Sequence, residues 1–233
     1  MLAKPAFEVQ SLVTDAELVK KRRAQIIAAA VDLFAHQGYY KTTIQDVAKK
    51  AGVSAGLIYQ YVRDKEDVLL LSVLDVLDSY KQEIPAATQG LTDPLDRFKA
   101  AIYAYCRVVD QRREATVLAY RSTKSLSPER RQLIMASEIE TNALIAQCLK
   151  DGIKAGLFRD VDPDLATYHF VGLAHSWALK HWRIKQIAGF ERYVEEGFDF
   201  LVHALLTDKG WQHYKKLQAE KAGKERKKSS KAR

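Results

Sequence analysis

The stretch TTIQDVAKKAGVSAGLIYQYVRDKE, residues 42–66, contains two short helix patterns separated by a glycine. In the first pattern Thr43 can cap a helix with Asp46 at its third position, as in a capping box. Gly52 can adopt the left-handed backbone conformation that ends this helix in a sharp turn. Ser54 can then cap a second helix about two turns long. The pattern predicts a helix-turn-helix whose second helix fits a DNA major groove.

The exposed side of this second helix carries small and planar side chains, which let the backbone approach DNA while polar groups reach base edges or phosphates. Asp64 is the expected cap of the next helix, and Lys65 lies in its first turn, where it could help to hold a phosphate. Tyr59 and Tyr61 could instead be packing residues, and Lys65 a solvated lysine. The predicted DNA-binding residues are Thr43, Gln45, Ser54, Ala55, Gly56, Leu57, Tyr59, Gln60, Tyr61 and Lys65.

The segments FAHQGYYKTTIQDVA and AGVSAGLIYQYVRDKEDVL resemble the N-terminal domain of the TetR family of transcriptional regulators, over about residues 18–70. The resemblance implies phosphate contacts from Thr43, Tyr59 and Lys65. Val62 departs from the family pattern, which more often has phenylalanine there. Because valine keeps an apolar side chain in the small core, we expect a slightly different helix angle with DNA binding retained. The residues that match the family pattern are Thr43, Ala48, Gly52, Val53, Ser54, Gly56, Tyr59, Tyr61 and Lys65.

The formal net charge of +8 is concentrated at the C-terminus of the chain. Residues 208–233 contain ten Lys or Arg and three Asp or Glu, so they carry +7, whereas residues 1–66 carry only +3. We therefore expect affinity for DNA to depend on a dimer with placed contacts. The tail KERKKSSKAR could add a salt-sensitive, sequence-blind attraction to DNA, or it could be a disordered solubilising end.

Size and composition indicate a helical globular protein with a sizeable core, since the chain has 233 residues, 47% of them hydrophobic, and only five prolines. No run of residues reaches membrane-spanning length, so we expect no membrane partner. The start MLAKPAFEVQ lacks the apolar stretch of a signal peptide, which favours a cytoplasmic location. Cys106 and Cys148 lie far apart among apolar neighbours, and we expect buried small hydrophobes rather than a disulfide.

Helix start and stop signals recur along the chain, and strand alternation is absent. Thr14 with Glu17 predicts the start of a first helix that ends near Gly38, and Asp64 the start of a long helix that closes before Pro85. Three later starts place a cap residue before a proline, whose missing amide hydrogen costs nothing in a first turn. These starts are Asp93-Pro94, Ser127-Pro128 and Asp162-Pro163, and breaks are expected at Gly156 and Gly189.

The predicted fold is therefore all-α, with about nine helices. We expect a helix-turn-helix DNA-binding domain over residues 1–63, a helical ligand-binding and dimerisation domain over residues 64–207, and a basic tail over residues 208–233.

Two late segments, about residues 163–185 and 190–206, have more apolar surface than one core face needs. In the TetR family the last two helices usually pair into a four-helix dimer interface, so the resemblance implies a homodimer formed here. The alternative is that these apolar stripes are simply core. The candidate dimerisation residues are Phe170, Ala174, Ala178, Val194, Phe198, Leu201 and Leu205.

The middle helices carry aromatic and aliphatic residues beside two cations, and an apolar cavity with a few polar groups could form between them. Aromatic residues at helical spacing can equally be core. The candidate ligand-binding residues are Phe98, Ile102, Tyr105, Val117, Tyr120, Arg121, Lys124 and Trp177.

The segments YRSTKSLSPERRQL and GLFRDVDPDLATYHFVGLAHSWALKHWRIK are similar to those of family members that control fatty-acid or aromatic-acid degradation and respond to acyl-CoA thioesters. The resemblance implies a tunnel for the acyl chain with basic residues at its mouth that meet phosphates. The alternative for these cations is a solvated or ion-paired face. They are Arg121, Lys124, Lys180, Arg183 and Lys185.

Other chemistry finds little support in the sequence. His169, His175 and His181 are six residues apart along one helix, so successive members do not form a metal pair. No nucleophile elbow and no glycine-rich phosphate loop occurs, and we expect neither a cofactor nor an enzyme.

The sequence thus predicts a homodimeric, ligand-responsive transcriptional regulator that binds double-stranded operator DNA. We expect a repressor released by a small apolar effector such as an acyl-CoA. The alternatives are a regulator of a different apolar ligand, as in efflux control, a sequence-blind nucleoid protein driven by the tail, and an enzyme that uses the second-domain cavity.

Overall fold

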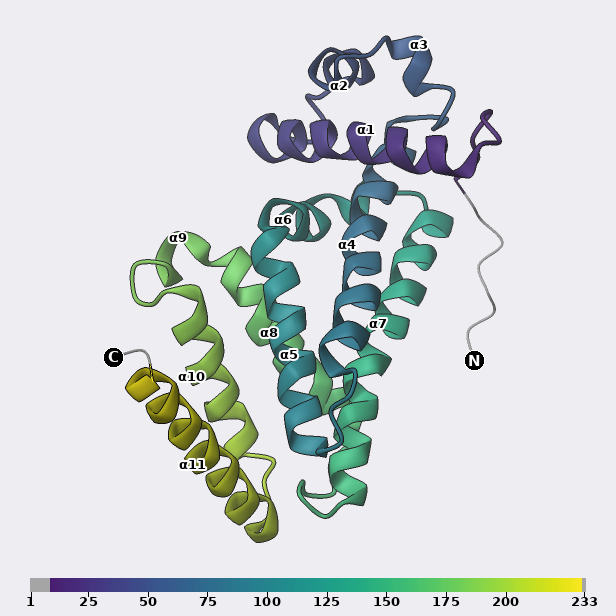
Figure 1. Ribbon diagram of the computed structural model, residues 1–233. Coiled ribbons are helices and arrows are strands. Elements are labelled where there is room, and N and C mark those ends of the chain that lie inside the picture. The colour runs from purple at the N-terminus through teal and green to yellow at the C-terminus, as the bar shows by residue number, and fades with distance from the viewer. Residues whose placement is uncertain (1–8, 232–233) are drawn as a thin grey trace.

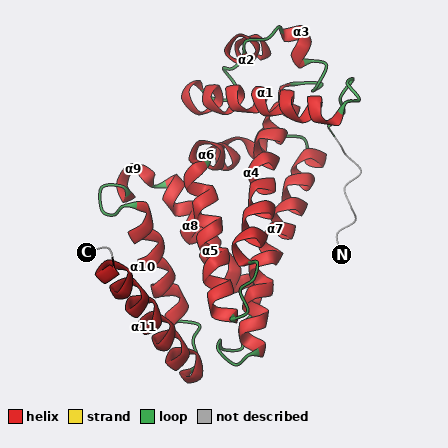
Figure 2. Cartoon of the chain, in the orientation of Figure 1, coloured by secondary structure: helices red, strands yellow, loops and turns green. Residues whose placement is uncertain are grey.

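The computed structural model describes the backbone of residues 9–231 and the side chains of residues 9–220. The segment MLAKPAFE and the side chains of KERKKSSKAR lie outside the described residues. Within the described chain no β-strand forms, and one isolated antiparallel bridge joins Phe158 and Leu206 (Figure 2). The all-α prediction is confirmed.

Eleven α-helices and one 3₁₀ turn make up the described part. Nine of the α-helices are eight residues or longer, which matches the predicted number, and α3 and α9 have four residues each. The elements are α1 (Ala16–Gln37), α2 (Ile44–Ala51), α3 (Ala55–Ile58), α4 (Lys65–Thr88), α5 (Pro94–Gln111), α6 (Arg113–Ser122), η1 (Thr123–Ser125), α7 (Pro128–Lys154), α8 (Pro163–Leu179), α9 (His181–Ile184), α10 (Phe190–His203) and α11 (Asp208–Lys231).

Helices α1, α2 and α3 form a small unit at one end of the molecule, with α1 lying across the top of the remaining helices (Figure 1). The interior of this unit is apolar, because α1, α2 and α3 each turn one face inward. Its central side chains are Ile26, Ala30, Phe34, Val47, Ala48, Ile58 and Tyr61, all buried.

The larger unit is a helical bundle in which α4, α5, α7 and α8 pack against one another, with α6 across the end nearest α1 (Figure 1). Phe98 of α5 lies at its centre, with its ring 5.4 Å from Phe158, 4.9 Å from Phe170 and 5.8 Å from Phe198. Aromatic rings at these separations bury large apolar areas and also interact edge to face. The bundle therefore owes its shape to residues from four separate segments of the chain.

The three proline-led helix starts are confirmed. Asp93, Ser127 and Asp162 are the N-caps of α5, α7 and α8, and each side chain accepts a hydrogen bond from a backbone amide of the first turn. The expected breaks also occur, with Gly156 in the left-handed region after α7 and Gly189 directly before α10.

Two helix boundaries differ from prediction. The cap of α1 is Asp15 rather than Thr14, and its carboxylate accepts a hydrogen bond from the Leu18 amide at 3.0 Å. Both residue types cap helices well, so the sequence leaves a one-residue ambiguity. Helix α4 runs through Pro85 to Thr88, because a proline one turn from a helix end removes only one backbone hydrogen bond.

The second helix of the helix-turn-helix is shorter than predicted. α3 spans one turn rather than two, and the chain then tightens, with the amides of Gln60 and Tyr61 donating to the carbonyls three residues earlier. Tyr61 and Val62, which follow this tighter turn, are buried in the core.

The C-terminal basic segment forms helix α11, packed beside α10 at the opposite end of the molecule from α2 and α3 (Figure 1). Tyr214 is buried and its hydroxyl donates to the Asp199 carboxylate at 2.8 Å, which fixes the start of α11 on α10. No described helix is long and apolar enough to cross a membrane.

Candidate DNA-binding surface and ligand cavities

The turn between α2 and α3 has the geometry that its sequence predicts. Thr43 and Asp46 form the reciprocal capping box, with the Asp46 amide donating to the Thr43 hydroxyl at 3.1 Å. Gly52 has φ of 68°, a left-handed conformation that side chains resist, and Ser54 caps α3 through the Leu57 amide. These signals place α3 on the outer surface of the small unit.

Most of the predicted DNA-binding residues share this outer surface. Ala55 and Leu57 are partly exposed. The exposed members are Thr43, Gln45, Ser54, Gly56, Tyr59 and Gln60.

Two predicted DNA contacts are placed elsewhere. Tyr61 is 2% exposed and packs in the domain core, so its ring offers no surface to DNA. The Lys65 ammonium donates to the carbonyls of Tyr39 and Thr42, each at 3.0 Å, and lies 4.5 Å from the centre of the Tyr39 ring. In this state Lys65 holds the loop before α2, which makes it a positioning residue for Thr43.

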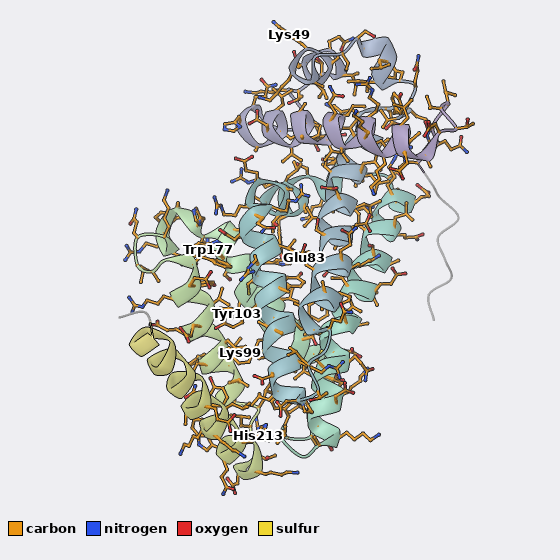
Figure 3. The ribbon with its side chains drawn as sticks, in the orientation of Figure 1. Lys49, Glu83, Lys99, Tyr103, Trp177 and His213 are labelled. Atoms are coloured by element: carbon orange, nitrogen blue, oxygen red, sulfur yellow. The ribbon has the colours of Figure 1, made fainter. Side chains whose placement is uncertain are left out.

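Lys41 and Lys49 are exposed cations that the sequence reasoning did not single out. Figure 3 shows Lys49 pointing away from the rest of the molecule at the outer end of α2. Their signal was available in the sequence, since Lys41 and Lys49 flank the first helix of the helix-turn-helix and Lys49 belongs to a basic pair in the last turn of α2. Such exposed cations suit phosphate contacts beside a groove.

An apolar cavity of about 380 Å³ lies between α4, α5, α6, α7 and α8. Val73, Leu77 and Ile134 contribute aliphatic surface, and Tyr80, Tyr105 and Tyr120 contribute rings. This cavity lies in the larger unit, on the side of α6 that faces α4 and α7.

A histidine organises the polar groups of this cavity. The Tyr105 hydroxyl is 3.0 Å from Nε2 of His175, and the Tyr120 hydroxyl is 2.8 Å from Nδ1. Burial lowers the pKa of His175 to about 4, so the imidazole is neutral near pH 7 and one of its nitrogens accepts while the other donates. The site therefore has fixed hydrogen-bonding groups and no buried positive charge at His175.

Two further groups around the cavity lack partners within the described residues. The Tyr80 hydroxyl is buried near the side chains of Tyr105 and Thr116 but makes no hydrogen bond of normal geometry, although its ring stacks on Tyr105 at 4.0 Å. Glu138 has no ion pair, and burial raises the pKa of its carboxyl group. Buried polar groups are normally hydrogen-bonded, so the buried Tyr80 hydroxyl and the half-buried Glu138 carboxyl mark positions where a bound molecule would be stabilised.

The predicted ligand-binding residues divide between three places. Tyr105, Tyr120 and Lys124 line the apolar cavity. Val117 and Arg121 line a second cavity of about 790 Å³ on the other face of α6, towards α1 and α9. Phe98, Ile102 and Trp177 line neither of these two cavities and are buried in the core, where Trp177 of α8 (Figure 3) packs against Tyr193 of α10.

Sequence reasoning missed Tyr80 and Glu138, and it considered His175 only as a metal ligand. Their partners come from helices far apart in the chain, since His175 of α8 meets Tyr105 of α5 and Tyr120 of α6. No local sequence pattern indicates that these residues lie close together. Among the described residues no cluster of three or more His, Cys, Asp or Glu is arranged to hold a metal, and Cys106 and Cys148 are free and buried, as predicted.

A buried arginine joins the wall of the apolar cavity to the start of α4. Arg130, in the first turn of α7, donates to Asp64 at 2.7 Å, to Glu66 at 2.9 Å and to Asp67 at 2.7 Å. We call this group the Arg130 clasp. Burial opposes ionisation of Asp67, but hydrogen bonds from Arg130 and Arg63 outweigh it and lower the Asp67 pKa.

Two neutral contacts reinforce the clasp. The Ser127 amide donates to the same Glu66 carboxylate oxygen at 3.0 Å, and the hydroxyls of Tyr40 and Ser125 are 2.6 Å apart. The chain from Thr123 to Arg130 thus lines the cavity at one end and binds the start of α4 at the other, and its Ser125 meets Tyr40 of the small unit.

The candidate dimerisation residues fill the protomer's own core. Phe170, Ala174, Ala178, Val194, Phe198 and Leu205 are buried, and Leu201 is partly buried. Because side chains buried inside one chain cannot meet a second copy, this list is a correction in favour of the core alternative. The exposed large apolar residues of these helices are instead Leu165, Tyr168 and Leu179 of α8 and Phe200 of α10.

Family models match two parts of the chain. The one described as bacterial regulatory proteins, tetR family, covers residues 26–71, and the one described as tetracyclin repressor-like, C-terminal domain, covers residues 91–182.

Individual proteins agree with these matches. The chain is 51% identical over 205 residues to the HTH-type transcriptional regulator HbdR of Aromatoleum sp. (strain CIB), covering 88% of this chain and 90% of that protein. It is 31% identical over 166 residues to the HTH-type transcriptional repressor KstR2 of Rhodococcus jostii (strain RHA1), covering 69% and 79%. The solved structure of AibR in complex with isovaleryl coenzyme A and operator DNA has a TM-score of 0.65 at 20% identity, covering 75% and 95%, a likeness of fold.

Proposed function

The chain belongs to the TetR family and is a ligand-responsive, DNA-binding transcriptional regulator, and from this premise we propose that it is a homodimeric repressor released from its operator by an acyl-CoA. The observation that carries the proposal is the continuity between the wall of the apolar cavity and the Arg130 clasp on the start of α4, which directly follows the DNA-binding unit. A molecule that fills the cavity thereby acts on the position of α4.

We assign DNA reading to the unit over residues 1–63, with α3 in the major groove. Tyr59, Gln60 and the small face at Gly56 supply the close approach, while Thr43 and the exposed Lys49 supply backbone contacts. One turn of helix and a charge of +3 over residues 1–66 make one copy a weak binder. Two copies on successive groove faces are therefore needed. Because the operator is chromosomal DNA, the proposed location of the protein is the cytoplasm.

The proposed dimer surface is the outer face of α8 and α10. Leu165, Tyr168 and Leu179 recur along one side of α8, and Gly172 on that side has nothing within 4 Å of where a Cβ would lie. Phe200 of α10 is 78% exposed. Large exposed apolar side chains in a contiguous stripe mark an interaction face, and a central glycine lets a second helix approach closely.

Replacing Phe200 by glutamate tests this surface. Sedimentation equilibrium should show a dimer for the wild type and a shift to monomer for Phe200→Glu, with operator binding lost in parallel. Ile139→Glu is the matched control, because Ile139 is a comparably apolar and exposed residue on α7. An unchanged dimer in Phe200→Glu excludes this face.

The proposed effector places its acyl group in the apolar cavity. Aliphatic and aromatic walls favour an apolar group, and neutral His175 with its two tyrosines can hydrogen-bond a carbonyl or hydroxyl on it. The AibR structure, which has the same fold, holds isovaleryl coenzyme A together with operator DNA, and the name of KstR2 describes a repressor. These relatives support a thioester and repression for this chain.

Release follows as a population shift between two arrangements of α4. An acyl group that pushes α6 and the Thr123–Ser125 turn away from α4 also moves the start of α7, and with it the clasp on Asp64 and Asp67. Differential binding of about 1 to 3 kcal/mol between the two arrangements changes operator affinity roughly 5- to 150-fold.

A direct test measures operator release. DNA selected for binding from a random pool is titrated with the protein in a fluorescence anisotropy assay, and a panel of acyl-CoAs differing in chain length and aromaticity is then added. At least one thioester should weaken binding within this range, whereas coenzyme A without an acyl group should not reach the same effect. If every thioester leaves the operator affinity unchanged, the effector proposal fails.

Tyr120→Phe gives the matched variant for the cavity. It removes only the hydroxyl that meets His175, so operator binding should persist while the thioester concentration needed for release rises. Tyr103→Phe serves as control, because this tyrosine is half-buried on α5, lines neither cavity and lies outside the proposed dimer surface.

A further inference from the structure

The second cavity lies at the junction of the two units. The end of α1 and the loop after it contribute His36, Gly38 and Tyr39. Helix α6 contributes Arg121, and α9 with the residue after it contributes His181 and Lys185. Its volume of about 790 Å³ is twice that of the apolar cavity. We call it the junction cavity.

Positive charge gathers on the walls of the junction cavity. Arg121 and Lys185 are exposed and form no ion pair among the described residues, unlike Arg113, which pairs with Asp110. The single carboxylate among the lining residues is that of Glu114. Arginine and lysine side chains free of acidic partners, held around one concave surface, attract anions.

A half-buried imidazole adds a hydrogen-bonding group to this wall. Nδ1 of His181 is buried and has no hydrogen-bond partner among the described residues. The His181 ring rests edge-on against Trp177 with 4.8 Å between ring centres, and Trp177 in turn donates to Asp110 at 2.8 Å. Burial, together with the nearby charges of Arg113 and Lys185, lowers the pKa of His181, so its ring is neutral near pH 7. The contact with Trp177 holds this neutral ring in place beside Arg121 and Lys185.

We infer that the junction cavity is a binding site for the phosphate groups of a small phosphorylated molecule. Arg121 can donate two parallel hydrogen bonds to phosphate oxygens, Lys185 supplies a second positive charge, and an N–H of His181 supplies a neutral donor. The inference does not require the effector to be a thioester, since a free nucleotide offers the same chemistry.

The junction cavity and the apolar cavity approach each other at the end of α6. Arg121 and Ser122 line the former, whereas the next two residues, Thr123 and Lys124, line the latter. A long molecule could therefore place phosphates on one face of α6 and an apolar group on the other. A separate phosphorylated compound could equally occupy the junction cavity alone.

A molecule bound here would lie against both units, because the cavity is lined by the end of α1 from the DNA-binding unit and by Arg121 from the bundle. Such a ligand favours whichever arrangement of the units keeps these groups together. The site thus adds a control on operator affinity that does not act through the Arg130 clasp.

The test is isothermal titration calorimetry of the full-length protein with coenzyme A, ADP and inorganic phosphate. We expect coenzyme A or ADP to bind, and Arg121→Glu and Lys185→Glu each to weaken that binding at least about tenfold, the usual loss for a charge-assisted hydrogen bond. Glu114→Gln should tighten binding. Arg107→Glu is the matched control, because Arg107 is exposed on α5 and lines neither cavity, and its affinity should stay within about twofold of the wild type.

The outcomes separate the two sources of phosphate. Binding of coenzyme A but not ADP assigns the phosphates to a thioester effector, whereas binding of ADP or phosphate without coenzyme A assigns them to a separate compound. The inference is overturned if no probe binds, or if Arg121→Glu and Lys185→Glu bind as Arg107→Glu does. It stands even when thioesters fail to release operator DNA, so this test and that of the effector proposal can fail independently.

Discussion

The DNA-binding unit and the apolar cavity treat their polar groups in opposite ways. Around α2 and α3, the hydroxyls of Thr43 and Ser54 are each used within three residues to cap a helix. Around the cavity, Tyr80 and Glu138 lack partners among the described residues, and His175 is satisfied only by tyrosines from other helices. The first region is complete by itself, whereas the second is arranged for a molecule that supplies the missing partners.

Arg130→Ala is the largest expected disturbance, because it breaks the clasp that holds α7, in the wall of the cavity, on the start of α4. It leaves Asp67, whose side chain is 0% exposed, without its main cation, and breaking a buried ion pair costs about 3 to 5 kcal/mol. Urea unfolding should show this loss. Arg131→Ala, next along α7, should change stability by less than about 1 kcal/mol by the usual size of surface effects.

The clasp also connects stability with regulation. A double variant, Arg130→Met with Asp67→Asn, removes the buried charge at Asp67 together with its cation and should recover part of the stability lost in Arg130→Ala. If the clasp transmits the effector signal, this variant binds operator but responds less to thioester. A fully responsive double variant would show that the signal travels by another route.

The sequence could predict features that depend on neighbouring residues, as in the DNA-binding unit, but not contacts between distant segments, as around the cavity. Capping boxes, proline-led starts and the glycine at φ of 68° act over a few residues, so the helix-turn-helix and the starts of α5, α7 and α8 could be predicted. The contact of α7 with the start of α4 could not be predicted from the sequence. Arg130 and Asp67 are 63 residues apart, and nothing in either local pattern selects the other.

The same physical limit explains the misplaced dimer and DNA residues. An apolar stripe on a helix shows that one face is buried, but it does not say whether a neighbour in the same chain or a second copy covers it. Phe198 proved to be core, whereas Phe200, two residues on, is exposed. Likewise Lys65 has the right type and position for phosphate, and only the folded loop shows that carbonyls of Tyr39 and Thr42 receive its ammonium.

The second largest effect concerns pH at the cavity. His175 has a pKa of about 4 when folded, against 6.5 in an unfolded chain. As pH falls from about 6.5 to 4, the unfolded chain takes up a proton that the folded protein does not, so the free energy of unfolding falls by roughly 3 kcal/mol over this window. Below that window this contribution stays constant.

Thermal unfolding between pH 7 and pH 4.5 measures this loss. His175→Gln should flatten the pH dependence, whereas His169→Gln, which alters an exposed histidine on the same helix, should leave it as in the wild type. Equal pH profiles for the wild type and His175→Gln would show that the imidazole is not held neutral by burial. The contrast between the DNA-binding unit and the cavity would then rest on Tyr80 and Glu138 without His175.

A smaller effect is expected from the orphaned hydroxyl of Tyr80. Tyr80→Phe removes a buried group that has no partner and should stabilise the ligand-free protein by about 1 kcal/mol, since an unsatisfied buried polar group costs 1 to 3 kcal/mol. Chemical unfolding in the absence of effector gives the sign. A loss of stability instead would show that the hydroxyl is already hydrogen-bonded in the empty cavity.

The smallest effect distinguishes contact with DNA from support of the fold. Tyr59→Phe removes one exposed hydroxyl from the DNA-facing surface, so stability should not change, while affinity falls by about 1 kcal/mol, roughly fivefold. The loss should be the same for every sequence if the hydroxyl meets a phosphate. Lys65→Ala should instead lower stability and affinity together, because its ammonium holds the loop that positions Thr43. If Tyr59→Phe changes preference at one base position only, the hydroxyl reads a base, and the DNA-binding surface is more specific at Tyr59 than a backbone contact would make it.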